Sequence, residues 1–463
     1  MKGDRSLHRV LIPAIAGGLA IVVVGFVALS NTFLGSSGFD QTYAPFTLVG
    51  STTGRINAVS CPSPGECVAV GTWGSAYLMT QHGGKWSAPV GFAPSPNNEQ
   101  AGNPALSDVS CWHTGDCVAI GQVVLSRSGS PYLGDVWHPF VVVERDGTWK
   151  SPEFIYQGRG SLSFTLVKCW SRGNCIVGGT LSPASAPYGP SSVVVGLERR
   201  GHWQGLHAVT SAAVGAALTA AACTSTGLVC AVSGSTSTDG LAVLLHGDHW
   251  TTVRVAPPSG APPGTTVSLW SASCAGSGFC AAAGYSGIPN SSGAGDSTVL
   301  VTDDHGTPHV ILRVDLGRLA PHIKGSGATG IACWSAYHCL IVGNASDNRG
   351  VQRGLGILIQ SEHNQAFFVG GSLQVVSCTL SAACTASGSG VGRTDDTFFM
   401  FGHRGVRMVI YHAQQKISGQ IDVLACSGDG ACTAGGFLAV TGDNFTNMPT
   451  LVSVQEGHQH PIG

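Results

Sequence analysis

Short apolar and small-residue runs alternate with turn residues along most of the chain. Residues 55–61 and 67–73 form two such runs, joined by a turn that has a cysteine at each end. Residues 76–80 form a third run, and residues 85–90 form a fourth after a Gly-Gly turn. Runs of this length between Gly, Pro, Ser and Asn predict β-strands, and helical periodicity is not evident in them. The pattern therefore predicts a four-stranded unit.

The cysteine hairpin recurs, and the whole unit recurs with it. The sequence has 16 cysteines in eight local pairs, and the first cysteines of successive pairs are 45 to 59 residues apart. A four-stranded unit of this length matches one propeller blade, and eight units are enough to close a ring. We therefore predict an all-β fold, an eight-bladed β-propeller over residues 41–463. The pairs are Cys61/Cys67, Cys111/Cys117, Cys169/Cys175, Cys223/Cys230, Cys274/Cys280, Cys333/Cys339, Cys378/Cys384 and Cys426/Cys432.

The two ends of the repeat region predict how the ring closes. The last unit has a third strand at residues 450–454 but no proper fourth strand, whereas residues 43–49 precede the first hairpin without a unit of their own. Pairing these two segments in one blade would hide the edges of the ring. Because the strand before each first cysteine carries mostly short side chains, we place it innermost. The strand after the second cysteine comes next, and the strand that bears tryptophan lies outermost.

Composition narrows the class of partner and the compartment. Charged residues are 10% of the chain and the formal net charge is −2, which disfavours nucleic acid as a partner. Each cysteine pair encloses five residues, or six in one case, whereas structural zinc sites typically use C-x2-C pairs. The spacing favours disulfides formed in an oxidising compartment over metal sites. We expect no metal and no cofactor.

The N-terminal segment predicts export. Residues 1–9 carry Lys2, Arg5 and Arg9 against Asp4, and residues 10–30 contain no charged residue. An apolar run of about 20 residues can cross a bilayer, and its basic flank stays on the cytoplasmic side. We predict a single-pass signal-anchor in the plasma membrane, a Gly/Ser tether at residues 31–40 and an extracytoplasmic propeller. The alternative is a signal peptide cleaved after the small-x-small motif at residues 28–30, which would give a secreted protein.

The phrase Ser60-Cys61-Pro62-Ser63, with its continuation through residue 71 and the Gly-Gly-Lys-Trp turn after residue 82, resembles exported actinobacterial propellers built from Cys-hairpin repeats. More distantly, the chain is similar to the Asp-box (BNR) propellers, which include sialidases and photosystem II assembly factors. The resemblance covers nearly all of residues 41–463. It implies a propeller fold and no particular reaction, and residues 146–149 only approach the Asp-box pattern.

The variable loops predict a binding face. In a propeller, the loops between second and third strands and between blades lie opposite the hairpin turns, and loops on a rigid scaffold often carry function. Aromatic, acidic, amide and basic residues in these loops suit a sugar or a peptide, and they also suit ordinary solvated loops. The possible binding residues are Tyr132, Trp137, His138, Tyr188, Asp347, Arg349, Arg353, Arg393, Asp395, Asp443 and Phe445.

Other candidate chemistry is weaker. Asp303/Asp304 and Asp395/Asp396 lack the spacing of a calcium loop, and His246 and His249 flank a Gly-Asp turn, so turn residues are the favoured interpretation. The tryptophans at positions 86, 149, 203 and 250 recur at one blade position, which indicates packing. Sialidase chemistry needs an arginine cluster, a tyrosine with its glutamate and an acidic proton donor, and this set cannot be assembled.

The sequence thus predicts an extracytoplasmic binding or scaffold module for a protein or a cell-envelope glycan. Two alternatives stay open: a glycan-processing enzyme of the sialidase or lyase type, and an assembly factor for an envelope complex.

Overall fold

The computed structural model shows an all-β chain, with no helix among the residues that it describes. The strands from Tyr43 to Ser453 belong to one compact unit. The predicted membrane anchor and tether lie outside the described residues. No helix in the described part of the chain is long and apolar enough to span a membrane. The structure describes residues 41–45, 54–92, 94, 101–125, 136–156, 158, 160–183, 190–210, 215–227, 229–276, 278–288, 296–302, 308–313, 323–360, 363–379, 384–389, 396–402, 405–410, 417–427, 432–440 and 447–454.

The described strands form eight antiparallel sheets that share one strand order. The first strands are β2 (Gly54–Ser63), β7 (Ala101–His113), β12 (Ser161–Ser171), β17 (Ala217–Cys223), β21 (Thr266–Ala275), β25 (Ile323–Ser335), β29 (Val375–Cys378) and β33 (Ile417–Cys426). The second strands are β3 (Glu66–Trp73), β8 (Asp116–Leu125), β13 (Asn174–Ser182), β18 (Val229–Ser235), β22 (Phe279–Gly287), β26 (His338–Asp347), β30 (Cys384–Ser389) and β34 (Cys432–Val440).

The third and fourth strands complete each sheet. The third strands are β4 (Ala76–His82), β9 (Val136–Arg145), β14 (Ser192–Arg199), β19 (Gly240–His246), β23 (Asp296–Thr302), β27 (Gln352–Gln360), β31 (Asp396–Gly402) and β35 (Asn447–Val454). The fourth strands are β5 (Lys85–Trp86), β10 (Thr148–Trp149), β15 (His202–Trp203), β20 (His249–Val255), β24 (Pro308–Arg313), β28 (His363–Gly370), β32 (Gly405–Ile410) and, beside β35, β1 (Gln41–Pro45).

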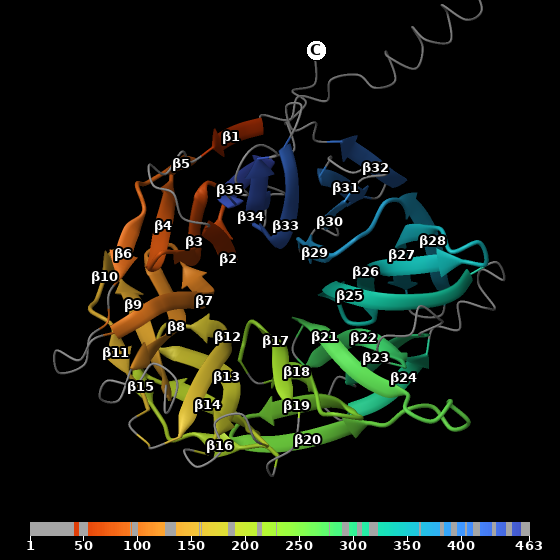
Figure 1. Cartoon of the computed structure of the whole chain (residues 1–463), viewed down its shortest axis with the longest axis horizontal. Helices are drawn as coiled ribbons and strands as arrows, with labels where there is room; N and C mark the ends of the chain where they lie inside the picture. The colour runs from red at the N-terminus through yellow and green to blue at the C-terminus, as the bar shows by residue number, and fades with distance from the viewer. Residues whose placement is uncertain are drawn as a thin grey trace, which may run out of the picture. The chain divides into compact units, whose positions relative to one another are not determined.

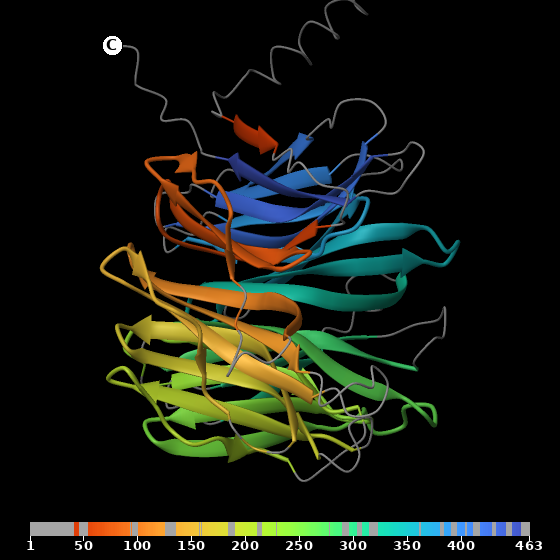
Figure 2. The same cartoon turned by 60° about the vertical axis from the view of Figure 1, so that its left-hand side comes forward.

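The first strands of successive sheets contact one another in chain order, and β33 of the last sheet contacts β2 of the first. Figure 1 shows these strands around a common centre, with the other strands farther out, and Figure 2 shows the sheets stacked from the side. This radial arrangement is that of a β-propeller. It confirms the predicted order of strands from the centre outward.

The outer strand of the first three sheets is broken, which the sequence analysis did not predict. Short strands β6 (Val90–Phe92), β11 (Glu153–Phe154) and β16 (His207–Ala208) pair with the third strand after a gap. Pro89 and Pro152 lie in two of these gaps, and proline cannot donate a ladder hydrogen bond. The outer edge is therefore irregular where the sequence pattern suggested one continuous strand.

All eight predicted disulfides are present, and the described residues include no free cysteine. Each joins the first strand of a sheet to the second at their shared turn, with Cα atoms 4.0–4.2 Å apart, closer than the common disulfide spacing of about 5.5 Å. Seven pairs lie directly opposite in the described strand registers, where antiparallel Cα atoms approach most closely. The bonds are Cys61–Cys67, Cys111–Cys117, Cys169–Cys175, Cys223–Cys230, Cys274–Cys280, Cys333–Cys339, Cys378–Cys384 and Cys426–Cys432.

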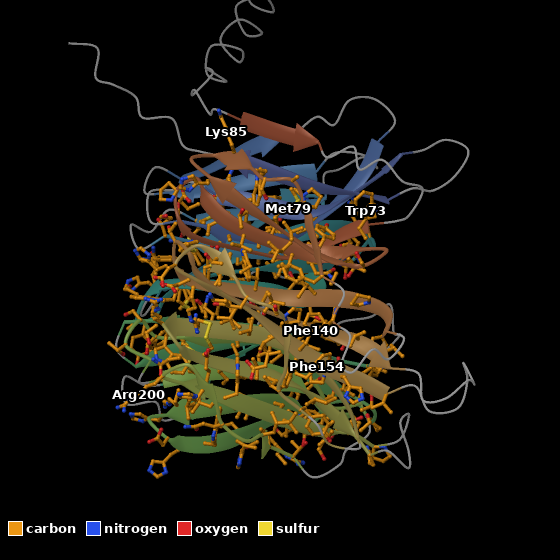
Figure 3. All side chains as sticks on the ribbon, turned by 90° about the vertical axis from the view of Figure 1, so that its left-hand side faces the viewer. Trp73, Met79, Lys85, Phe140, Phe154 and Arg200 are labelled. Atoms are coloured by element: carbon orange, nitrogen blue, oxygen red, sulfur yellow. A yellow bond between two sulfur atoms is a disulfide. The ribbon has the colours of Figure 1, made fainter. Side chains whose placement is uncertain are left out.

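The hairpin turns of a sheet lie on one side of the molecule, as predicted. The amide of Gly84 donates to the carbonyl oxygen of Gly65 at 3.0 Å, which joins the outer turn to the cysteine turn. Figure 3 shows Lys85 and Arg200, from outer turns, on one side and Trp73, at the end of β3, on the other. We call the two sides the hairpin face and the loop face. The apolar core, with Met79 and Phe140 fully buried, lies between adjacent sheets.

Candidate functional site

Each disulfide that the sequence analysis predicted is anchored in the core through its second cysteine. The second cysteine of every pair is at most 4% exposed, because it begins a strand that is covered on both faces by neighbouring sheets. The first cysteines of six pairs are partly buried, and each bond joins the first two strands of its sheet, so we assign the disulfides a structural role. The eight buried second cysteines are Cys67, Cys117, Cys175, Cys230, Cys280, Cys339, Cys384 and Cys432.

The first strands carry a β-bulge at the same place in seven sheets, four residues before the first cysteine. The register skips residues 57, 107, 165, 219, 270, 329 and 422. A bulge bends its strand and re-aims the extra side chain. Because these are the innermost strands, the bulges surround the centre of the ring. We call these seven residues the axial bulge ring.

Most of the axial bulge ring ties one sheet to the next. Thr165, Thr219 and Thr329 donate through Oγ1 to the carbonyl oxygens of Leu218, Leu269 and Leu373 in the next sheet, over 2.7–3.1 Å. The Asn57 side-chain amide does the same to the carbonyl oxygen of Leu106 at 2.7 Å. These bonds satisfy the acceptors that neighbouring sheets present to each other.

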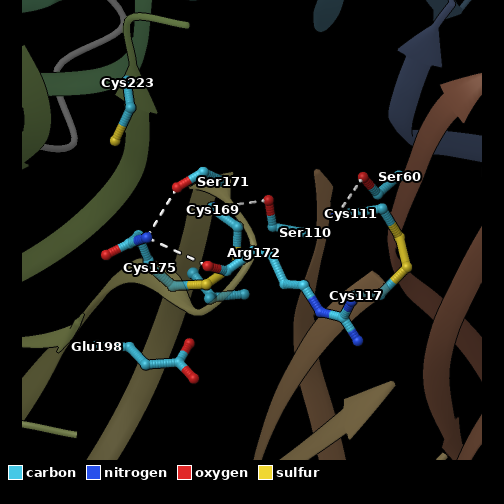
Figure 4. The surroundings of a disulfide bond; sticks show 12 residues. Ser60, Ser110, Cys111, Cys117, Cys169, Ser171, Arg172, Cys175, Glu198 and Cys223 are labelled. Atoms are coloured by element: carbon cyan, nitrogen blue, oxygen red, sulfur yellow. Dashed lines mark hydrogen bonds between the residues drawn. A yellow bond between two sulfur atoms is a disulfide. The ribbon is translucent and has the colours of Figure 1, made fainter. Parts of the chain in front are cut away.

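A second set of contacts between sheets lies next to the disulfides. The amide of Cys111 donates to Ser60 Oγ at 3.0 Å, and the amide of Cys169 donates to Ser110 Oγ at 2.9 Å. Figure 4 shows both bonds beside their disulfides. The serine before a first cysteine therefore has a structural role, which explains part of the repeating phrase.

Two members of the axial bulge ring depart from this pattern. Asp422 in β33 forms an ion pair with Arg55 in β2 at 3.0 Å, which links the last sheet to the first. Trp270 carries an indole in place of a hydroxyl or amide and is 48% exposed. Its ring stacks on Tyr285, with ring centroids 6.3 Å apart and planes inclined by 17°. The sequence analysis missed Trp270, although its position four residues before Cys274 was a readable signal.

Asp108 in β7 and Lys168 in β12 both have shifted pKa values. The two carboxylate oxygens of Asp108 accept the amides of Val109 and Val167 at 2.8 and 2.7 Å. Burial raises the pKa of Asp108 to about 6, against the lowering effect of those hydrogen bonds. Burial also lowers the pKa of Lys168, and the charge of Asp108 opposes that shift. Shifted groups are frequent at functional sites, but here the hydrogen bonds give Asp108 a structural role between two sheets.

The structure brings together only some of the residues predicted for the binding face. Asp347, Arg349 and Arg353 lie at the β26–β27 connection. Asp347 Oδ1 accepts the amides of Arg349 and Val351 at 2.8 and 3.0 Å, and Asp347 Oδ2 lies 4.0 Å from Arg353 Nε. The amide of Val351, followed by that of Arg349, lowers the pKa of Asp347. Asp347 therefore shapes its own turn, while the Arg349 and Arg353 side chains remain exposed.

The other predicted binding residues are described only in part. Trp137 is 37% exposed near the start of β9, and its amide donates to Ser161 Oγ at 3.0 Å. His138 follows it and is half-buried opposite Val123. The remaining predicted positions lie outside the described residues: Tyr132, Tyr188, Arg393, Asp395, Asp443 and Phe445.

The remaining chemical candidates of the sequence analysis are accounted for where they are described. His246 and His249 pair across the turn between β19 and β20, as predicted for turn residues. Asp303 and Asp304 lie outside the described residues. The tryptophans at 86, 149, 203 and 250 are half-buried and pack on the core. In the described chain, no three His, Cys, Asp or Glu side chains gather in a way that could hold a metal ion.

The hairpin face carries ion pairs between neighbouring sheets. Arg172 reaches Asp146 at 2.7 Å and Asp116 at 3.4 Å, and Arg145 reaches Glu198 at 3.1 Å. These charges compensate one another across the boundaries between the sheets. The loop face presents a different chemistry, because exposed apolar side chains lie at three of its strand connections: Trp137, Ile288 and Val351.

Comparisons with known proteins show likeness of fold alone. No family model and no curated protein matches the chain. Among solved structures, polysaccharide lyase Uly1 is 8% identical with a TM-score of 0.45, covering 90% of this chain and 92% of that one. The propeller domain of the Trilobed protease from Pyrococcus furiosus is 7% identical with a TM-score of 0.43, covering 77% and 99%. The WD40 propeller domain of Doa1 is 10% identical with a TM-score of 0.39, covering 90% and 97%.

Proposed function

We propose that this protein is a membrane-anchored, extracytoplasmic binding module whose eight-bladed propeller holds a protein or cell-envelope glycan on its loop face. The eight sheets, the contact between β33 and β2, and the order β1-β35-β34-β33 support a closed ring whose last blade is shared by both ends of the repeat region. The eight disulfides support an oxidising compartment. The anchor follows from the apolar run at residues 10–30.

One observation carries the binding role. Trp137, Ile288 and Val351 are 37%, 40% and 49% exposed and lie at the second-to-third strand connections of three sheets. Exposed side chains on the loops of a rigid scaffold often take part in binding. Disulfide-pinned hairpins and hydrogen bonds between sheets would keep such a face preorganised, so that little ordering entropy is lost on binding.

The test is capture of a stoichiometric partner from native membranes by the full-length protein, with a glycan array run beside it. We expect the double variant Trp137→Ser/Val351→Ser to lose the captured partner. The matched control is Trp112→Ser, because Trp112 is 46% exposed but follows Cys111 at the hairpin face. Equal capture by the wild type and the double variant, or failure of the wild type to bind any protein or glycan, would contradict the proposal.

A glycan-processing enzyme is the second candidate, and the shifted pKa values of Asp108 and Lys168 favour it. This candidate is weaker because both carboxylate oxygens of Asp108 already accept main-chain amides. Incubation of the full-length protein with envelope polysaccharide distinguishes the two candidates. New reducing ends or unsaturated sugar products would favour the enzyme, and their absence together with retained binding would favour the binding module.

A further inference from the structure

The inference starts from the one large aromatic residue in the axial bulge ring. Four members of the ring, Asn57, Thr165, Thr219 and Thr329, close onto the next sheet through a hydroxyl or an amide. Trp270 occupies the same position in β21 and leaves nearly half of its surface exposed. A threonine would fulfil the structural role of this position, so the repeat does not require tryptophan here.

Tyr285 packs against one face of the Trp270 indole. It lies in β22 opposite Ser268 and stacks on Trp270 in a near-parallel arrangement. On its other side is Gly327 of β25, where an added β-carbon would lie 3.5 Å from Tyr285 Cβ. The tyrosine is therefore held between its own sheet and the next one. The exposed indole is a rigid flat surface, and a ligand could stack on it at little cost in side-chain entropy.

The surroundings of this aromatic pair are polar and close to neutral. Thr219 in the preceding first strand is exposed, and Ser268 and Ser271 flank Trp270 within β21. Thr219 Oγ1 donates to the carbonyl oxygen of Leu269 and Ser271 Oγ accepts the amide of Ile331, which leaves the Ser271 hydroxyl able to donate. Asp422 belongs to the axial bulge ring, and its ion pair with Arg55 compensates its charge. Hydroxyl groups beside an apolar ring face complement a pyranose, which presents a C–H face and a rim of hydroxyls.

We propose that Trp270, backed by Tyr285, is a stacking platform for a neutral pyranose unit of a glycan at the centre of the ring. The inference rests on the proposed binding function and narrows its partner class to a glycan. A nucleic acid or an acidic peptide would call for uncompensated basic side chains, which the described members of the axial bulge ring do not supply.

The decisive variant is Trp270→Thr, because it restores the residue type found at positions 165, 219 and 329. Its hydroxyl can donate to the carbonyl oxygen of Ala328, which corresponds to the acceptors Leu218 and Leu269. We expect this variant to be as stable as the wild type and to lose binding. If Trp270 had only a packing role, the same substitution would lower the melting temperature instead.

The experiment titrates the full-length protein with cellotetraose, chitotetraose and mannotetraose, followed by tryptophan fluorescence and calorimetry. We expect at least one oligosaccharide to bind, with affinity reduced about ten-fold or more in Trp270→Thr and less in Trp270→Phe, which keeps a ring. Trp112→Thr, at the similarly exposed tryptophan of the hairpin face, is the control and is expected to bind as the wild type does.

Three results would overturn the inference. One is unchanged oligosaccharide affinity in Trp270→Thr, and another is no binding of any of the three oligosaccharides. The third is capture of a protein partner by the wild type but not by Trp270→Thr, while no oligosaccharide binds. Trp270 would then be part of a peptide-binding site. A partner still captured through Trp137 and Val351 in any of these cases would leave the proposed binding function standing.

Discussion

Glu144 and Trp149 lie opposite each other in the pairing of β9 with β10, and each has a buried polar atom without a hydrogen-bond partner. The atoms are Glu144 Oε2 and Trp149 Nε1. Burial, and then the nearby charge of Asp116, raises the pKa of Glu144 to about 7. The hairpin face therefore contains a carboxyl group that stays protonated in the folded protein up to about pH 7.

The substitution Glu144→Gln is expected to weaken the pH dependence of stability. The folded protein binds a proton at Glu144 up to about pH 7, whereas the unfolded chain releases it near the ordinary pKa of 4.5. Since the folded state binds more protons in this window, the free energy of unfolding of the wild type falls as pH rises from about 4.5 to above 7. At pH 8 the variant is expected to be about 1–3 kcal/mol more stable than the wild type. Denaturant melts between pH 5 and pH 8 measure the difference.

Glu153→Gln is the control, because Glu153 is an exposed carboxylate in the same sheet. Asp108, whose pKa is raised to about 6, acts in the same direction as Glu144 and remains in both variants. Some pH dependence should therefore persist. A Glu144→Gln curve parallel to the wild-type curve would show that Glu144 is charged in the folded protein.

Thr219→Val tests the hydrogen bonds of the axial bulge ring. Valine keeps the shape of threonine but removes the hydroxyl that donates to the carbonyl oxygen of Leu269 at 2.7 Å. Loss of one such bond costs about 0.5–1.5 kcal/mol. Thr251→Val is the control, because Thr251 is an exposed threonine in outer strand β20. Equal denaturation midpoints for the two variants would mean that the bulge threonines do not hold adjacent sheets together.

Much of the fold was predictable because each sequence signal recurs in eight repeats. The spacing of Cys169 and Cys175 predicted a disulfide across a hairpin, and the short side chains before each first cysteine predicted the innermost strand. Repetition also made tryptophans such as Trp149 recognisable as packing residues. A local pattern that recurs at one position in every unit identifies a structural requirement of that unit.

The candidate site was less predictable, because its residues differ from those at the equivalent positions of the other repeats. A bulge leaves no mark in a period-two pattern, so the sequence analysis had no reason to compare the residues four positions before each first cysteine. The loops were chosen by composition, and Asp347 proved to hold its own turn together. Trp270 became notable only when the register placed it beside Thr219 and Thr329 as an equivalent position.

Removing one disulfide is expected to cost moderate stability without unfolding the ring. The loop closed between Cys333 and Cys339 is short, so the double variant Cys333→Ala/Cys339→Ala should lose about 2 kcal/mol in the chain-entropy model. Thiol titration of the native wild type should find no free cysteine among the eight pairs. Reduced thiols in the native protein would contradict both the disulfide-bonded hairpins and the proposed oxidising compartment.

Gly284→Ala should be among the more damaging single-methyl changes in the chain. Gly284 lies opposite Leu269 at the bulge of β21, and an added β-carbon would fall well inside contact distance of the Ser268 carbonyl oxygen. Gly234 and Gly343 meet the corresponding carbonyl oxygen in their own sheets, so the bulge requires glycine on the facing strand. Because the obstructing atom belongs to the main chain, the strand must shift, and we expect a loss of about 2–3 kcal/mol.

The control for this glycine is Gly205→Ala, since an added β-carbon at position 205 meets no atom within 4 Å. Its effect on the free energy of unfolding should stay within about 0.5 kcal/mol, as for most surface substitutions. Thermal and denaturant melts of both variants measure the contrast. Similar stabilities would show that the first strand can relax its bulge around a methyl group, and the requirement for glycine on the facing strand would then be wrong.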